Sequence, residues 1–137
     1  MSSMTIIQNQ VTINRPVAEV YAFLADCNNH EQLMPENIYN WSSTRDEATF
    51  TIQNMAKLSL RIDSRIDNSE VVFVPAEKAP FDVTLRWKVA SATDHTAIAL
   101  LIIEADLNMM MKMMATKPLQ KLVDKQVEQL KVIMDRS

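Results

Sequence analysis

The sequence contains no glycine in 137 residues, and this absence limits what the chain can fold into. Phosphate-binding loops, dinucleotide-binding loops, the G-x-S-x-G turn of many hydrolases and calcium loops all need glycine for a tight turn or a close backbone approach. None of these motifs is present in standard form. The tight turns must therefore use Asn and Asp, which tolerate positive φ better than other side chains do. We expect turns at four pairs: Asn28-Asn29, Arg45-Asp46, Asp67-Asn68 and Asp94-His95.

Length, composition and charge predict one globular domain over residues 1–137. Hydrophobic residues make up 47% of the chain and charged residues 23%, a balance that allows a sizeable core. The net charge is −3 and the basic residues are scattered, which argues against a nucleic-acid partner, because phosphate contacts need a basic stripe. The same scatter predicts no patch for an anionic membrane. The longest purely apolar run, residues 97–103, falls far short of the roughly 18 residues of a transmembrane helix.

The cysteine count and the N-terminus predict a cytoplasmic location. Cys27 is the single cysteine, so no intramolecular disulfide can form, and a reducing compartment is expected. Residues 1–5 lack a basic region followed by a long apolar stretch, so they do not resemble a signal peptide.

Apolar and polar residues alternate along several short segments in the middle of the chain. The clearest is residues 81–89, and residues 49–53 and 57–63 repeat the pattern. Period-two alternation predicts an antiparallel sheet with one covered and one solvated face, and the short connections favour a meander. About seven strands are expected in all, the others covering residues 5–13, 38–43, 70–74 and 96–105.

Helical periodicity appears near the start and at the end of the chain. Residues 16–25 form an amphipathic segment, with Asn14 or Arg15 as its expected cap. A second short helix is expected at residues 29–33. The C-terminal stripe predicts one long helix that Pro118 either begins or kinks, its apolar positions being Leu119, Leu122, Val123, Val127, Leu130, Ile133 and Met134.

This order of elements predicts an α+β helix-grip fold. A curved antiparallel sheet of about seven strands must cover its apolar face, and one long helix lying across it, helped by two short helices, does so. Such an arrangement leaves a space between the helices and the sheet. The periodicity does not decide whether side chains fill that space.

Three segments resemble the START/SRPBCC superfamily, which includes birch-pollen-allergen-like proteins, polyketide cyclases and lipid-transfer domains. Residues 11–24, V-T-I-N-R-P-V-A-E-V-Y-A-F-L, resemble the first strand and helix of that superfamily. Residues 33–38 and the methionine-rich residues 108–118 are similar to small bacterial members of Bacteroidetes type, which have no assigned reaction. The resemblance covers essentially the whole chain and implies a helix-grip fold with a cavity for a hydrophobic ligand.

The inward residues of the alternating strands and of the long helix are the candidate walls of such a cavity. Methionines 110, 113 and 114 are expected on a helix face toward the sheet, where they either fill core gaps or line the cavity; the third alternative is an exposed contact patch for a partner or a membrane. Trp41 and Trp87 are expected to be core residues, and the second alternative is that they stack against a ligand. The candidate cavity residues are Leu58, Leu60, Ile62, Val83, Leu85, Trp87, Met110, Met113, Met114 and Leu122.

Few residues point to catalysis. Cys27 and His30 could together form a thiol–imidazole nucleophile pair. We expect instead that they are surface residues of a polar turn that lie near each other by chance. Two histidines and one cysteine are too few for an ordinary zinc site, so no metal or cofactor is expected. Glu104 and Asp106 would face the cavity in one strand register and water in the other. We favour the second, because it buries no charge and aligns six apolar residues inward: Ala97, Ala99, Leu101, Ile103, Ala105 and Leu107.

Three functions follow from these patterns. The first is a binding domain for a small hydrophobic molecule of the lipid, polyketide or isoprenoid class. The second is a cyclase, dehydratase or hydrolase that uses acid–base groups in the cavity, with Glu104, Asp106, Arg61 and Tyr39 to examine and Arg61 expected outside. The third is a protein-interaction module, which predicts an exposed apolar patch at residues 109–114 or a homodimer that buries it.

Overall fold

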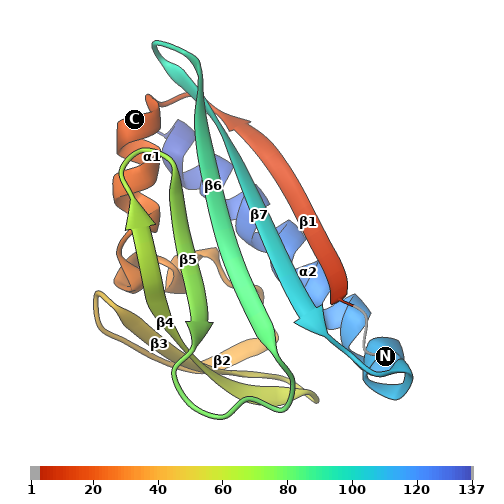
Figure 1. Ribbon diagram of the computed structural model, residues 1–137. Helices are drawn as coiled ribbons and strands as arrows, with labels where there is room; N and C mark the ends of the chain where they lie inside the picture. The colour runs from red at the N-terminus through yellow and green to blue at the C-terminus, as the bar shows by residue number, and fades with distance from the viewer. Residues whose placement is uncertain (1–3, 137) are drawn as a thin grey trace.

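The fold is a curved antiparallel sheet gripped by helices (Figure 1). The computed structural model describes residues 4–136, so part of the N-terminal segment considered above lies outside the described residues. The elements in chain order are β1 (Met4–Ile13), α1 (Val17–Leu24), the 3-10 helices η1 (Cys27–Asn29) and η2 (Glu31–Leu33), β2 (Ile38–Ser43), β3 (Glu47–Ile52), β4 (Ala56–Ile66), β5 (Glu70–Pro75), β6 (Val83–Thr93), β7 (Thr96–Asp106) and α2 (Met109–Asp135).

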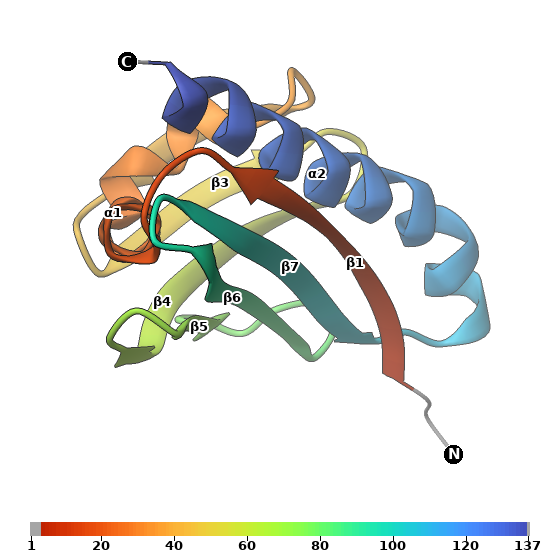
Figure 2. The same ribbon diagram turned by 90° about the horizontal axis from the view of Figure 1, so that it is seen from above.

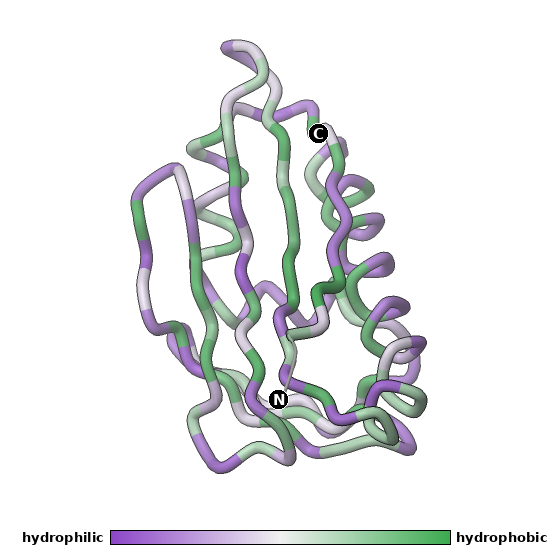
Figure 3. Tube along the Cα trace, turned by 45° about the vertical axis from the view of Figure 1, so that its right-hand side comes forward, coloured by the Kyte–Doolittle hydropathy of each residue, from purple (hydrophilic) through white to green (hydrophobic). Residues whose placement is uncertain are grey.

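All seven strands belong to one sheet in the order β1-β7-β6-β5-β4-β3-β2. Strands β2 to β7 form the expected meander, and β1 completes the sheet by pairing with β7 in antiparallel register. Apolar and polar residues alternate along several of the strands, whereas β7 is apolar from residue 97 to residue 103 (Figure 3). The sheet curves, and α2 lies across its concave side with α1 at one end (Figure 2). The helix-grip α+β fold expected from the sequence is confirmed.

Strand β7 adopts the register that buries no charge. Residues Ala97, Ala99, Leu101, Ile103 and Ala105 are buried in the core, and Leu107 continues the same side. Glu104 and Asp106 lie on the other side, partly exposed, where Arg86 Nη1 is 3.4 Å from Glu104 Oε1. The favoured register is therefore confirmed.

Helix α2 is held beside β1 and the segment that follows it by polar contacts at the middle and at the C-terminal end of its buried stripe. Asn9 Nδ2 donates to Asp124 Oδ1 at 3.0 Å, and the backbone N–H of Asn14 donates to Asp135 Oδ1 at 2.8 Å. Arg15 Nε donates to the carbonyl of Met134 at 2.7 Å. Asn14 and Arg15 thus anchor the end of α2. Neither residue caps α1: its N-cap is Pro16, without a side-chain cap, so that expectation was wrong.

Pro118 lies inside α2, nine residues after its first residue, Met109. It therefore does not begin the helix. Figure 2 shows α2 curving in this N-terminal part, as expected where proline removes one backbone hydrogen bond and clashes with the preceding turn.

Asparagine takes the place of glycine in the tight turns. The described residues with positive φ are Asn40 (56°), Asn54 (63°) and Asn68 (59°). Asn68 belongs to one of the four expected turn pairs. Asn54 lies in the β3–β4 turn, and Asn40 lies at a register shift between β2 and β3, so neither was expected.

Candidate internal binding site

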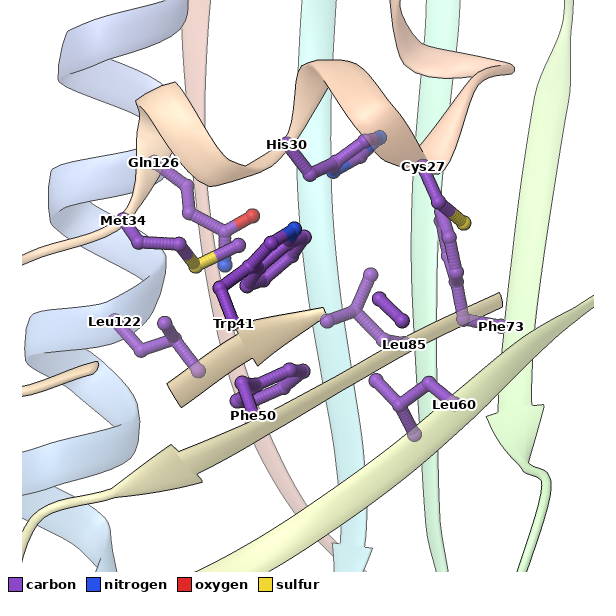
Figure 4. A pocket seen from close by; sticks show the side chains of 11 residues that line it. Cys27, His30, Met34, Trp41, Phe50, Leu60, Phe73, Leu85, Leu122 and Gln126 are labelled. Carbon is purple, nitrogen blue, oxygen red and sulfur yellow. The ribbon is translucent and has the colours of Figure 1, made fainter. Parts of the chain in front are cut away.

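A small cavity lies between α2, the two 3-10 helices and the concave face of the sheet (Figure 4). The space open to the centre of a water molecule is about 20 Å³, roughly what one water molecule needs. Aromatic rings occupy much of the remaining room: Trp41 stacks on Phe50 with ring centroids 5.4 Å apart. The space between helix and sheet is therefore largely filled. Its lining residues are Cys27, His30, Met34, Trp41, Ala48, Phe50, Leu60, Phe73, Leu85, Leu122 and Gln126.

The structure brings three of the ten candidate cavity residues together at this site. Leu60, Leu85 and Leu122 line the cavity. The other strand candidates, Leu58, Val83 and Trp87, are buried in the surrounding core without lining it, and Ile62 is half-buried at the edge of that core.

The three candidate methionines lie outside the cavity, so the expected orientation toward the sheet was wrong. Met110, Met113 and Met114 are 72%, 81% and 62% exposed. The reason is the phase of the helix. Extending the buried stripe of Ala115 and Leu119 back by one turn reaches Met111, which does pack against the core.

Gln126 is the polar residue of the cavity that the sequence analysis missed. Gln126 is 1% exposed, and neither its amide oxygen nor its amide nitrogen has a hydrogen-bond partner among residues 4–136. Figure 4 shows it pointing from α2 toward Trp41, with Met34 beside it. The signal in the sequence was its position four residues after Leu122 and four before Leu130, on the apolar stripe.

His30 is also buried, contrary to the expected chance surface position. Its Nε2 lies 2.9 Å from the carbonyl oxygen of Leu24; since a carbonyl only accepts, Nε2 carries the proton and Nδ1 is the acceptor nitrogen. The ring packs edge-on against Phe73 at 5.3 Å. Burial lowers the pKa of His30 below its usual value of 6.5, despite the Leu24 hydrogen bond, so the ring is neutral near pH 7.

Cys27 is buried as well, and its thiol stays protonated. Burial, opposed by the positive charge of Arg65, raises the pKa of Cys27 to about 12. A nucleophilic cysteine needs a lowered pKa, so this environment does not activate the thiol.

The four ionisable groups considered for acid–base catalysis do not line the cavity. Glu104 and Asp106 lie on the outer face of β7; Arg61, as expected, and Tyr39 are exposed. Within residues 4–136, no three or more His, Cys, Asp or Glu side chains form a group that could hold a metal ion. No helix in that range is long and apolar enough to cross a membrane.

Comparison with known proteins gives a consistent picture of the fold. No protein-family model matches this sequence, and no curated protein matches it. Among solved structures, the KanY protein superposes with a TM-score of 0.77 at 17% identity, covering 97% of this chain and 99% of that one. A START superfamily protein from Mycobacterium smegmatis has a TM-score of 0.66 at 11% identity (93% and 98% covered). Norcoclaurine synthase from Thalictrum flavum has a TM-score of 0.75 at 6% identity (99% and 89% covered).

Proposed function

Since the chain has the helix-grip fold of the START/SRPBCC superfamily, we propose that it binds one small, mainly apolar molecule in an enlarged form of the cavity under α2. The observation that carries the proposal is Gln126, a buried amide in an apolar wall that no described residue hydrogen-bonds. Ligand sites typically combine such walls with a few polar groups that orient the ligand. The fold alone does not imply a reaction, because one fold hosts many functions.

The chemistry of the wall describes the ligand. Gln126 offers one acceptor and two donor hydrogens, so its partner is a group that donates and accepts, such as a primary amide, an alcohol or a protonated carboxylic acid. Leucine and aromatic side chains make up most of the remaining wall, which suits a hydrocarbon body of the lipid, polyketide or isoprenoid class.

Free energy favours occupation of this site by a molecule that satisfies Gln126. A buried polar group without a partner costs about 1–3 kcal/mol, and a ligand that makes the missing hydrogen bonds removes that cost. The body of the ligand gains roughly 0.8 kcal/mol for each CH₂ it buries.

The cavity must widen to admit more than a water molecule. Two of its lining residues, Met34 and Leu122, belong to different elements, the segment after η2 and helix α2. The side chain of methionine adapts to irregular apolar partners. We propose that movement of Met34 and Trp41, both only half-buried, makes the additional room.

The experiment is a melting-temperature series with probes that share a chain and differ in their head group: hexane-saturated buffer, hexanol, hexanamide and hexanoic acid. Hexanol and hexanamide are expected to raise the Tm more than hexane does, since binding to the native state stabilises it. Hexanoic acid is ionised near pH 7 and then only accepts, so it is expected to raise the Tm less than hexanamide does. Gln126→Met keeps the length and removes the amide, and it should abolish the difference between probes. Gln120→Met, on the surface of the same helix, should keep it. No Tm increase with any probe, or an unchanged preference in Gln126→Met, would overturn the proposal.

A further inference from the structure

Four of the nine exposed large apolar side chains among the described residues lie in the first two turns of α2. These four, hereafter the methionine end, are Met109, Met110, Met113 and Met114. The other five lie apart from them: Met4 and Ile6 on β1, Tyr39 on β2, Ile66 on β4 and Val132 near the other end of α2. Isolated exposed apolar residues are ordinary, whereas a gathered set marks an interaction surface.

Met4 and Ile6 do not extend this surface. They pair with Asp106 and Glu104 of β7, and directly paired residues of antiparallel strands lie on the same side of the sheet. That side is the outer face, whereas α2 lies on the concave side (Figure 2). The methionine end therefore consists of α2 residues alone.

The part of α2 that carries the methionine end is positively charged, although the whole chain is negative and its scattered basic residues were expected to form no anionic-membrane patch. Residues 109–123 of α2 contain Lys112, Lys117 and Lys121 and no carboxylate. Lys121 pairs with Glu36, while Lys112 and Lys117 are exposed and make no ion pair with a described residue. Lys117 follows Met113 by four residues, so it extends the same outward face of the helix.

From this charge and apolarity we propose that the methionine end docks on the surface of an anionic lipid bilayer. Thioether side chains enter the boundary between head groups and acyl chains, while Lys112 and Lys117 contact the lipid phosphates. The alternative occupant, a second copy, is disfavoured because a two-fold contact would place the lysines of both copies against each other. This inference does not depend on ligand binding in the cavity.

Flotation of the full chain with vesicles tests the proposal. Vesicles of equimolar phosphatidylcholine and phosphatidylglycerol are expected to carry at least about five times more protein than phosphatidylcholine alone, since each basic residue near an anionic surface favours binding. Raised salt should weaken the binding, because it screens the lysines.

Two variants separate the apolar and charged contributions. The pair Met110→Ser with Met113→Ser, and the pair Lys112→Gln with Lys117→Gln, should each lower the floated fraction several-fold with unchanged Tm. Matched controls are Ile66→Ser, 53% exposed on another element, and Lys88→Gln, exposed on β6; both should float as the parent chain does.

Three results would overturn the proposal: no flotation with anionic vesicles, equal flotation with both lipid mixtures, or unchanged flotation of the double methionine variant. Sedimentation equilibrium distinguishes the second-copy alternative. A homodimer that the methionine substitutions dissociate, in a chain that does not float, would assign this end to self-association instead.

Discussion

Lys121 Nζ lies 2.7 Å from Glu36 Oε1, and this ion pair joins α2 to the segment between η2 and β2. Each partner is close in sequence to a residue that lines the cavity: Glu36 lies two residues after Met34, and Lys121 directly precedes Leu122. The pair therefore holds together the two elements that carry Met34 and Leu122.

Removing the ion pair should increase opening between these two elements. Glu36→Gln is expected to speed amide hydrogen exchange in residues 34–38 near pH 7, measured by mass spectrometry. The hydrogen bond from Lys121 is the main cause that holds the pKa of Glu36 below its usual 4.5. The stabilisation that the ion pair provides is therefore present above that value and is lost as the pH falls through the lowered pKa. Parent and variant should therefore converge at strongly acidic pH. Glu77→Gln, on the β5–β6 loop, is the control; equal exchange in parent and Glu36→Gln at pH 7 contradicts the idea.

Gln126→Met should stabilise the empty protein. The substitution keeps the side-chain length and removes two polar groups that no described residue hydrogen-bonds, so the free energy of unfolding should rise by about 1–3 kcal/mol in urea denaturation. Gln120→Met removes the surface contact to Asp124 and should change the free energy of unfolding little. A loss of stability in Gln126→Met would mean that the amide is already satisfied in the unliganded protein.

The stability of the protein should fall in mildly acidic solution because of His30. Burial holds the pKa of the folded state below 6.5, so the unfolded state binds more protons between the two values, and stability rises with pH across that window. The contribution of His30 to the free energy of unfolding is complete above its pKa in the unfolded state. Below that pKa it decreases by at most about 1.4 kcal/mol per pH unit. Denaturation curves of His30→Phe should lose this slope, while His95→Gln should keep it. An equal slope in His30→Phe would assign the dependence to other groups.

Cys27 should be inert in the folded protein. The rise of its pKa from the usual 9.0 to about 12 lowers the thiolate fraction about a thousand-fold. Since only the thiolate reacts, the reactivity of Cys27 falls with it. Iodoacetamide labelling followed by mass spectrometry is expected to be slow in buffer and fast in urea. Rapid labelling of the native protein would show that the η1 region opens far more often than its burial implies.

Most of the fold could be predicted because sheet periodicity and the cost of buried charge are local properties. Residues 81–89 alternate without interruption, and the desolvation of Glu104 and Asp106 was enough to choose the register of β7. Asn40 and Asn54 were harder to predict, since their positive φ follows from how β2, β3 and β4 pair rather than from a turn-forming dipeptide.

The candidate site was less predictable because its shape depends on contacts between distant elements. Trp41 and Phe50 fill space that periodicity alone leaves undefined, and His30 is buried by its contact with Phe73 on β5. The orientation of Met110 and Met113 could have been predicted from the phase of the stripe containing Ala115 and Leu119. Gln126 could have been found too, as the single amide on that apolar stripe.

The central claim is that a molecule with one polar head group binds beside Gln126. The most direct measurement follows the side-chain amide resonances of Gln126 in ¹⁵N-labelled protein, assigned with Gln126→Met, during titration with hexanamide. The account predicts a saturable shift of these resonances, with those of Gln120 unchanged. A titration that leaves the Gln126 amide unaffected, up to the solubility limit of the probe, would contradict it.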